Sequence, residues 1–600
     1  MQTAKATPAS IMANDRLALL RTELRRQGLD GFVVPHSDEH QGEYIPPSAE
    51  RLAWLTGFTG SAGAAVVLAD RAALFVDGRY TLQAARQVDT TLYQHLHLIE
   101  QPPHQWLAAS LATGARVGYD PWLLTPGGVD QLQKACDKAG AQLIACAESP
   151  LDAVWTDQPT PPMAPVVPHP VAFAGKTSEQ KRAELTQELA AAGLDAAVLS
   201  ASESIAWLLN LRGGDVPYTP MPLSFGLLHQ DGTVALFIDG GKLSPDTIGH
   251  LGNAVSVATP QDLGPALDRL AGKRVRLDKD SVPAWIRDRL RAAKAEIDLG
   301  DDPCAIPRAC KNDVELNGFR QAHRRDGVAL VRFFAWLSQA ALDGSVTELS
   351  AADRLERFRE RGEHYRGLSF STISAAGPHA ALPHYHVTQE SNRKLAPGEL
   401  YLVDSGGQYL DGTTDVTRTV AIGAAGDEER RRFTQVLKGH IALARCRFPK
   451  GTTGSQIDCL ARLALWSDGV DFDHGTGHGV GSYLSVHEGP QRISKIPNAI
   501  VLAPGMILSD EPGYYKAGAY GIRTENLLVV RPWPGHGERE TCEFETLTLA
   551  PIDLALIDRD LLNEEEAAWL NAYHARVRSD LSPLLDGPTA AWLAEATRAI

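Results

Sequence analysis

The sequence of 600 residues lacks the features of a membrane protein, a secreted protein and a nucleic-acid-binding protein. No apolar run approaches the ~20 residues that a membrane-spanning helix needs. The N-terminus, MQTAKATPASIMANDRLALL, does not have the basic and then apolar layout of a secretory signal. No basic run occurs, and the net charge of −15 argues against a nucleic-acid surface. We therefore expect neither a membrane nor a nucleic acid as a partner.

Cysteine is scarce, and its seven residues form no recognisable framework. They are scattered from Cys136 to Cys542, and the two that lie nearest in sequence, Cys304 and Cys310, match no zinc-binding spacing. An odd, dispersed set of cysteines indicates a reducing, cytoplasmic location. The hydrophobic fraction of 44% is that of an ordinary folded protein, and the length predicts several domains.

The chain repeats itself on either side of a proline-rich segment. Six of the twelve residues from 159 to 170 are proline, which predicts a linker because neither a helix nor a central strand tolerates them. RLALLRTELRRQGLDGFVV (16–34) is answered by KRAELTQELAAAGLDAAVL (181–199), each an amphipathic helix, a glycine C-cap and an apolar strand. LAWLTGF and ALFVDGRY are echoed by IAWLLNL and ALFIDGGK at a nearly constant offset. The repeat predicts two copies of one α/β domain, 1–158 and 172–308, joined by a linker at 159–171.

The remaining residues, 309–600, form a third predicted domain. Residues 313–342 have apolar positions at helical spacing and predict one long helix. NEEEAAWLNAYHARV predicts a later helix, which Asn563 and Glu566 open with the spacing of a capping box. Strands and turns are expected between these two helices.

This third domain contains an internal echo that ends in acidic residues. LAPGELYLVDSGG (395–407) resembles LAPGMILSDEPG (502–513), and both Asp404 and Glu511 stand six residues after the glycine of LAPG. Each carboxylate therefore ends an apolar strand. The shared register predicts a pseudo-twofold domain in which each half supplies one acidic residue.

Each of these acids is followed by a second one. Asp415 lies eleven residues after Asp404, and Glu525 lies fourteen residues after Glu511, which suits two strands joined by a short turn. Four carboxylates in one pocket cannot all stay ionised without cations. With one imidazole added, these hard ligands suit a pair of Mn²⁺, Co²⁺, Fe²⁺ or Zn²⁺ ions.

The imidazole comes from HGTGHGVG, residues 474–481. Four glycines in eight residues make a helix improbable, although histidines four apart on a helix would share one face. Taken singly, each feature also has a purely structural interpretation. An aspartate at a strand end is usually a solvated turn residue, DGTTD is typical of a hairpin, and the glycine-rich loop could be a close-packed turn. Together, the paired spacings favour a metal site.

The order of five residues resembles that in the dinuclear metallopeptidases of the pita-bread fold. These residues are Asp404, Asp415, His478, Glu511 and Glu525. HGTGHGVG, VHEGP and SDEPGYY are similar to the proline-directed branch, and ERLAWLTGFTGSAG, DGRY, DGTTDVTRT, GIRTEN and CEFETLTLAPI extend the similarity to its long, three-domain aminopeptidase P type. The resemblance implies a mixed α/β and α+β chain, with two tandem creatinase-like α/β domains before a pita-bread catalytic domain.

The resemblance also assigns the five ligands. Asp404 would hold one ion, His478 and Glu511 the other, and Asp415 and Glu525 would bridge the two ions. Glu511 would accept the proton of the attacking water. The glycines around His478 would let backbones approach the metals closely.

Further roles are implied for three histidines and an arginine. His474 would belong to the substrate pocket, His487 would bond the substrate carbonyl, and His384 would shuttle a proton or stabilise the intermediate. Arg523 would bind substrate or support a ligand, although a salt bridge on a strand face is an equally simple interpretation.

Four other residues are expected to lie outside the chemistry. His379 and His386, close to His384, are interpreted as bystanders. Arg79 in DGRY is interpreted as structural, with contact to substrate as the alternative. Trp466 is interpreted as a buried core residue, with a dimer contact as the alternative.

The activity implied is metal-dependent release of the N-terminal residue from peptides with proline second (Xaa-Pro-Yaa). Two divalent ions, Mn²⁺ first among them, would be the cofactors, short Xaa-Pro peptides the substrates, and a cytoplasmic homodimer the assembly, with the N-terminal domains walling the site. A prolidase, which cleaves Xaa-Pro dipeptides, is the alternative enzyme. A peptide-binding module of the same fold is the alternative from another class, but such relatives lose the metal ligands.

Overall fold

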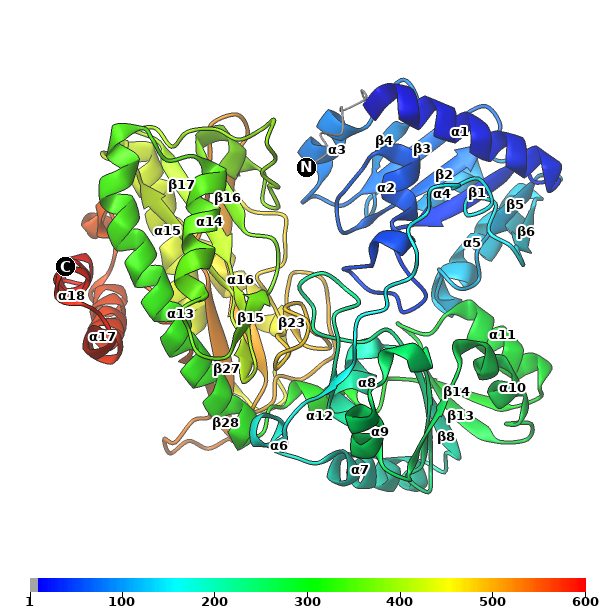
Figure 1. Ribbon diagram of the computed structural model, residues 1–600. Helices are drawn as coiled ribbons and strands as arrows, with labels where there is room; N and C mark the ends of the chain where they lie inside the picture. Colours follow the sequence, from blue (N-terminus) through cyan, green and yellow to red (C-terminus); the bar gives the residue numbers. More distant parts are fainter. Residues whose placement is uncertain (1–8) are drawn as a thin grey trace. The chain divides into compact units, whose positions relative to one another are not determined.

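The computed structural model describes residues 9–600, which fold as two units. Unit 1 comprises the chain up to His169 together with Lys176–Cys304, and unit 2 comprises Pro170–Gly175 and Ala305–Ile600. Figure 1 colours the chain along its length. Across the described residues, none of the helices combines the length and the apolar character needed to cross a membrane.

The first half of unit 1 is a six-stranded mixed sheet with the order β4-β3-β2-β1-β5-β6. Its strands are β1 (Gly31–Pro35), β2 (Gly63–Leu68), β3 (Ala72–Val76), β4 (Gln94–His97), β5 (Arg116–Tyr119) and β6 (Gln142–Ala145). Its helices are α1 (Ala9–Arg26), α2 (Arg51–Thr56), α3 (Thr81–Gln87), α4 (Pro103–Ser110) and α5 (Pro126–Ala139). Strand β1 pairs antiparallel with β2 and parallel with β5.

The second half of unit 1 has the same topology, with the order β12-β11-β10-β8-β13-β14. Its strands are β8 (Ala196–Leu199), β10 (Phe225–His229), β11 (Val234–Phe237), β12 (Val255–Ala258), β13 (Arg274–Asp278) and β14 (Glu296–Gly300). Its helices are α7 (Ser178–Ala191), α8 (Ser202–Leu209), α9 (Pro245–Leu251), α10 (Leu263–Asp268) and α11 (Ala284–Ala292). Strand β8 pairs antiparallel with β10 and parallel with β13, as β1 does with β2 and β5.

The internal repeat in the sequence therefore corresponds to two copies of one fold. Gly28 and Gly193, the predicted C-caps, have φ of 68° and 66°, a left-handed conformation that glycine adopts without steric cost. The proline-rich segment forms only a two-residue strand, β7 (Val167–Pro168), which pairs with β9 (Leu211–Arg212). Helix α6 (Val171–Ala174) follows it and belongs to unit 2.

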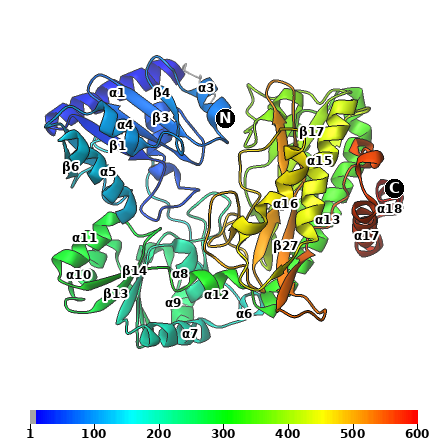
Figure 2. The same ribbon diagram turned by 180° about the vertical axis from the view of Figure 1, so that it is seen from behind.

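Unit 2 opens with α12 (Ala305–Ala309) and with α13 (Asp313–Ala340), the predicted long helix, which Asn312 and Glu315 begin with a capping box. The other helices are α14 (Glu348–Arg359), α15 (Asp427–Ala444), α16 (Gly454–Trp466), α17 (Glu564–Leu581) and α18 (Gly587–Ala596). Helix α17 begins at the capping box predicted for Asn563 and Glu566. Figures 1 and 2 show α13 and α14 in front of the strands in one view, and α15 and α16 in front of them in the view from behind.

The strands of unit 2 form several small sheets. The first half contributes β16-β17-β20 and β15-β18-β19, with β15 (Tyr365–Leu368), β16 (Ile373–Ala376), β17 (Leu400–Ser405), β18 (Gly407–Tyr409), β19 (Gly412–Thr413) and β20 (Val416–Ala421). The second half contributes β21-β28-β27-β24, β25-β26 and β22-β23, with β21 (Arg447–Pro449), β22 (Gly477–His478), β23 (Arg492–Ile493), β24 (Ile507–Asp510), β25 (Gly513–Lys516), β26 (Tyr520–Arg523), β27 (Asn526–Pro532) and β28 (Thr541–Thr546).

The two halves repeat the pairing that the LAPG echo predicts. Strand β17 runs antiparallel to β20, with Asp404 opposite Thr417, and β24 runs antiparallel to β27, with Asp510 opposite Asn526. The predicted short turns are wrong in detail. Each connection contains a small hairpin of its own, β18–β19 in the first half and β25–β26 in the second.

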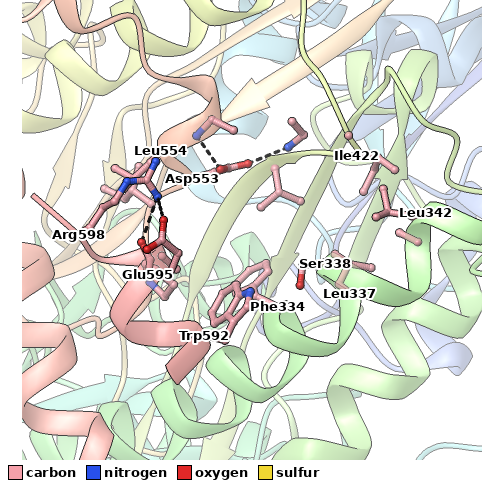
Figure 3. Close-up of a pocket in the computed structure, with 18 residues that line it drawn as sticks. Phe334, Leu337, Ser338, Leu342, Ile422, Asp553, Leu554, Trp592, Glu595 and Arg598 are labelled. Carbon is pink, nitrogen blue, oxygen red and sulfur yellow. Dashed lines mark hydrogen bonds and ion pairs between the residues drawn. The ribbon is translucent and has the colours of Figure 1, made fainter. Parts of the chain in front are cut away.

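The C-terminal helices leave one apolar pocket of about 300 Å³ on unit 2, shown in Figure 3. Its side chains include Phe334, Leu337, Ile422 and Trp592. Asp553, a half-buried acid of this pocket, accepts backbone N–H bonds from Ala421 and Ala555, both 2.9 Å long. None of the predicted site residues lines this pocket, so it is distinct from the candidate active site.

The interpretation of Trp466 as a core residue is wrong. Its side chain is 46% exposed, and Leu463, one turn earlier on α16, is 65% exposed. An amphipathic helix normally turns such residues inward. This face of α16 is therefore an apolar surface rather than part of the core.

Candidate metal centre and active site

The glycine-rich loop has the non-helical form expected from its sequence. His474 lies in a bend and His478 ends the short strand β22. A Cβ atom at Gly477 would lie 2.0 Å from the carbonyl oxygen of Ser509, and one at Gly479 would lie 2.0 Å from that of Glu488. These glycines therefore admit neighbouring backbone, where any side chain would collide.

Three predicted ligands converge on one point. Ligand atoms of Asp415, His478 and Glu525 all lie within 4.8 Å of one another. His478 Nε2 is 3.4 Å from Asp415 Oδ2 and 3.6 Å from Glu511 Oε1. Because His478 Nδ1 donates to the Gly479 carbonyl at 2.9 Å, the ring turns its Nε2 toward the acids, as a metal-binding histidine does.

Asp404 adjoins this cluster from the end of β17. Its Oδ2 accepts from Arg523 Nη2 at 2.6 Å, whereas its buried Oδ1 has no hydrogen-bond partner among the described residues. Burial raises the pKa of Asp404, and the neighbouring Asp415 raises it further, against the opposing effect of Arg523. A buried carboxylate oxygen without a donor is costly, and a metal ion would supply the missing partner.

The other titratable groups also fit a cation site. Burial raises the pKa of Glu511 to about 7 and that of Glu525 well above 4.5, and repulsion from the other acids adds to both shifts. Burial alone would lower the pKa of His478, but the hydrogen bond and charge of Asp415 and the charge of Glu511 raise it to about 9. A set of carboxylates and one imidazole that cannot all ionise together fits a pair of divalent ions.

Hydroxyl groups donate hydrogen bonds to two of the acids, Glu525 and Glu511. Thr417 Oγ1 donates to Glu525 Oε2 at 2.7 Å, and Ser509 Oγ donates to Glu511 Oε1 at 3.2 Å. Ser509 Oγ also accepts the backbone N–H of His478 at 2.9 Å. Such supporting bonds fix the orientation of ligands before a metal binds.

Arg523 does form a salt bridge on a strand, but the bridge is buried and its partner is Asp404. The side chain of Arg523 is 2% exposed, and its guanidinium also donates to Thr417 Oγ1 at 3.1 Å, to Tyr515 Oη at 2.6 Å and to the Pro383 carbonyl at 3.2 Å. It therefore joins β17, β20 and β25 at the site.

The predicted histidines occupy different surroundings. His474 is 8% exposed, and its Nε2 lies 2.7 Å from Tyr515 Oη. The ring of His487 meets that of His478 edge-on, with centroids 4.2 Å apart. His384 directly follows Pro383, whose carbonyl accepts from Arg523. His474 is therefore linked to Arg523 through Tyr515, and His487 contacts the predicted ligand His478.

Sequence reasoning missed two residues of this region. Tyr515 links His474 to Arg523, and only its place in SDEPGYY pointed to it. Arg462 on α16 is fully buried and donates to the carbonyls of Phe472 and His474, at 2.6 and 3.0 Å. Its pairing with Asp458 four residues earlier has the spacing of a common surface pair, so nothing in the sequence marked it as buried.

The two extra histidines that are interpreted as bystanders differ in burial. His386 is exposed. His379 is 19% exposed and its Nδ1 lies 2.9 Å from an oxygen of Glu348, which is fully buried.

In unit 1, Arg79 pairs with Asp77 at 2.8 Å and Glu43 at 3.4 Å, as a structural residue would.

The raised pKa values predict that the metal-free protein loses stability as the pH rises. The folded state holds the Glu511 proton up to pH 7, and the unfolded chain releases it near 4.5, so the free energy of unfolding falls across that window by on the order of 3 kcal/mol. The raised pKa of His478 acts in the same direction, between about 6.5 and 9. Thermal unfolding of metal-stripped protein at pH 5, 7 and 8.5 should give a falling Tm, and saturating Mn²⁺ should flatten the trend. A metal-free Tm that rises over this range would contradict the geometry described.

Family models match all along the chain. Metallopeptidase family M24 matches residues 317–532, and the C-terminal region of that family matches 540–600. The creatinase/prolidase N-terminal domain matches twice, at 16–153 and at 157–315.

Curated relatives are similar over their full length. A probable Xaa-Pro aminopeptidase P of Aspergillus niger is 39% identical over 98% of this chain and 99% of its own. One of Laccaria bicolor is 41% identical over 97% and 93%. The crystal structure of X-prolyl aminopeptidase from Caenorhabditis elegans, described as a cytosolic enzyme with a di-nuclear active site, matches with a TM-score of 0.94 at 36% identity, covering 98% of this chain and 100% of that one. This chain is an enzyme of metallopeptidase family M24, of the Xaa-Pro aminopeptidase P type.

Proposed function

We propose that this enzyme removes the N-terminal residue from peptides whose second residue is proline, and that five residues hold its two metal ions. The observation that carries the proposal is the convergence of Asp415, His478 and Glu525 within 4.8 Å, with Glu511 and Asp404 beside them. Relatives similar over the whole chain bear the name Xaa-Pro aminopeptidase P. By this assignment Asp404 would hold one ion, His478 and Glu511 would hold the other, and Asp415 and Glu525 would contribute to both.

The bond to be cleaved explains the need for such a site. The amide before proline carries a ring on its nitrogen and has no N–H to donate, so a pocket built to bind that N–H would fail. Two divalent ions, when bound, lower the pKa of water and polarise a carbonyl. Mn²⁺ is the preferred ion in this proposal because four of the five ligands are hard carboxylates, while Co²⁺, Fe²⁺ and Zn²⁺ remain alternatives.

The protein side chains supply proton transfer and orientation. Glu511, whose Oε1 lies 3.6 Å from His478 Nε2, would accept a proton from the attacking water. His487, in ring contact with His478, would donate to the substrate carbonyl oxygen, and His384 would stabilise the tetrahedral intermediate and assist departure of the proline nitrogen. His474 and Arg523, joined through Tyr515, would line the substrate pocket.

Peptide length distinguishes this function from a prolidase. Metal-stripped enzyme should regain cleavage of Xaa-Pro-Yaa tripeptides when Mn²⁺ is added, with little turnover of Xaa-Pro dipeptides, as measured by release of the first amino acid. Turnover of dipeptides alone would identify a prolidase. Binding of the ions and peptide without hydrolysis of either substrate would instead indicate a peptide-binding module.

A cytoplasmic homodimer is the proposed assembly. All seven cysteines, which lie within the described residues, are free there, and the Caenorhabditis elegans relative is described as cytosolic. Leu463 and Trp466 form an exposed apolar face on α16 that a second copy would cover. Leu463→Asp is therefore expected to yield a monomer in sedimentation experiments. An unchanged dimer would place the interface elsewhere.

A further inference from the structure

A buried carboxylate outside the metal centre gathers donors from a single segment. Glu348 is the first residue of α14 and has a fully buried side chain. Its two oxygens accept from the backbone N–H of Ala376 at 2.8 Å and of Arg393 at 3.2 Å, from His379 Nδ1 at 2.9 and 3.1 Å, and from Tyr385 Oη at 3.2 Å. A buried carboxylate is retained only with such a full set of partners, and the start of a helix favours it further.

The donors lie at the end of β16, where Ala376 is its last residue, and in the connection from β16 to β17. His379 and Tyr385 also stack on each other, with ring centroids 4.5 Å apart and planes inclined by 28°. Because a carboxylate only accepts hydrogen bonds, His379 Nδ1 carries the proton in this contact. His379 therefore combines an N–H donor to Glu348 with a flat face for Tyr385.

His384 stands between two anchored neighbours within this segment. On one side, the Pro383 carbonyl accepts from Arg523, whose guanidinium also binds Asp404. On the other side, Tyr385 is bonded to Glu348 and stacked on His379. The backbone of His384 is thus held on one side to Asp404, through Arg523, and on the other side to the buried Glu348.

We infer that Glu348 and His379 are positioning residues for His384, acting through Tyr385 and the 376–393 segment. This inference rests on the proposed function in so far as His384 takes part in the hydrolysis. A group that acts in the transition state loses effect steeply when it is displaced by as little as 1 Å. Release of one anchor should therefore lower kcat, while KM, set by the rest of the pocket, changes little.

The test compares three substitutions of His379 in the Mn²⁺-loaded enzyme. His379→Phe keeps the ring for Tyr385 but removes the donor, and we expect kcat on an Xaa-Pro-Yaa tripeptide to fall about tenfold to a hundredfold with KM within about twofold. His379→Asn places an amide N–H near the position of Nδ1 and should retain kcat within about threefold. His379→Gln carries its amide one carbon farther out and should resemble the phenylalanine variant. His536→Phe, the same exchange at an exposed position, is the matched control.

A second readout does not depend on turnover. Carbethoxylation of His384 by diethyl pyrocarbonate, followed by peptide mass spectrometry, should be at least about threefold faster in His379→Phe, because the loosened segment opens more often. Equal kcat and equal His384 labelling in wild type and His379→Phe would overturn the inference. If His379→Phe does not fold, equal behaviour of the asparagine and glutamine variants would overturn it. If the wild-type enzyme cleaved no Xaa-Pro peptide, the proposed function would be wrong. The comparison of His384 labelling would still show whether His379 restrains the 376–393 segment.

Discussion

Glu525→Gln is expected to lower kcat/KM for an Xaa-Pro-Yaa tripeptide by on the order of 10³ and to remove at least one of the two metal ions. The substitution keeps the shape of the side chain and its contact with Thr417 Oγ1, but it removes the charge that would bridge both ions. Because Glu525 is 1% exposed, water cannot enter easily to replace the missing ligand. Metal analysis after dialysis, together with steady-state kinetics, measures both effects.

Although Glu525→Gln should lower activity and metal binding, it should not lower the stability of the metal-free protein. The wild-type carboxyl has a pKa far above its usual range in the absence of metal, mainly because of burial, so a neutral amide removes an unfavourable ionisation. We therefore expect a metal-free Tm at pH 8 equal to or higher than that of wild type. Glu565→Gln, at an exposed acid on α17, serves as the control and should change neither metal content nor kinetics. Full activity with two bound ions in Glu525→Gln would refute the ligand assignment.

Arg523→Met is expected to destabilise the metal-free protein by about 3–5 kcal/mol, because it leaves the buried carboxylate of Asp404 without its cation. It also removes the donors to Tyr515 and Pro383, and so loosens the segment that carries His384. In the Mn²⁺-loaded enzyme, kcat/KM should fall by roughly 10–100-fold, as for other residues that support a metal ligand. Denaturant unfolding and steady-state kinetics test the two parts separately.

Two further variants make this result interpretable. Arg523→Lys keeps the charge but cannot reach Asp404, Thr417 and Tyr515 together, so its stability should lie between those of wild type and Arg523→Met. Arg531→Met removes an arginine that is 50% exposed and paired with Glu543, and should cost less than about 1 kcal/mol. If Arg523→Met were no more destabilising than Arg531→Met, the buried ion pair would have no structural importance.

Much of this protein could be read from spacing along the chain. The helix–glycine–strand repeat in the sequence corresponds to two sheets of identical topology in the structure. The LAPG echo corresponds to the strand pairs β17–β20 and β24–β27. The density of glycine in HGTGHGVG excluded a helix for His474 and His478. These features are local, because hydrophobic period, caps and glycine conformation depend on residues close in sequence. For the same reason, the hairpins inserted between the paired strands were missed, since loop length alone does not specify what the loop forms.

Long-range contacts between side chains were decided only by the tertiary structure. Arg462 and Trp466 both lie on α16. The arginine is buried and donates to the carbonyl of His474, whereas the tryptophan is 46% exposed. Arg523 is hydrogen-bonded to Asp404, 119 positions away in the sequence, and Glu348 to Tyr385, 37 positions away. The sequence by itself predicted five metal ligands and placed two of them, Asp404 and Glu511, at the ends of apolar strands. The fold decided which polar side chains surround them, because a buried charge selects its partners by proximity in space, which spacing along the chain does not encode.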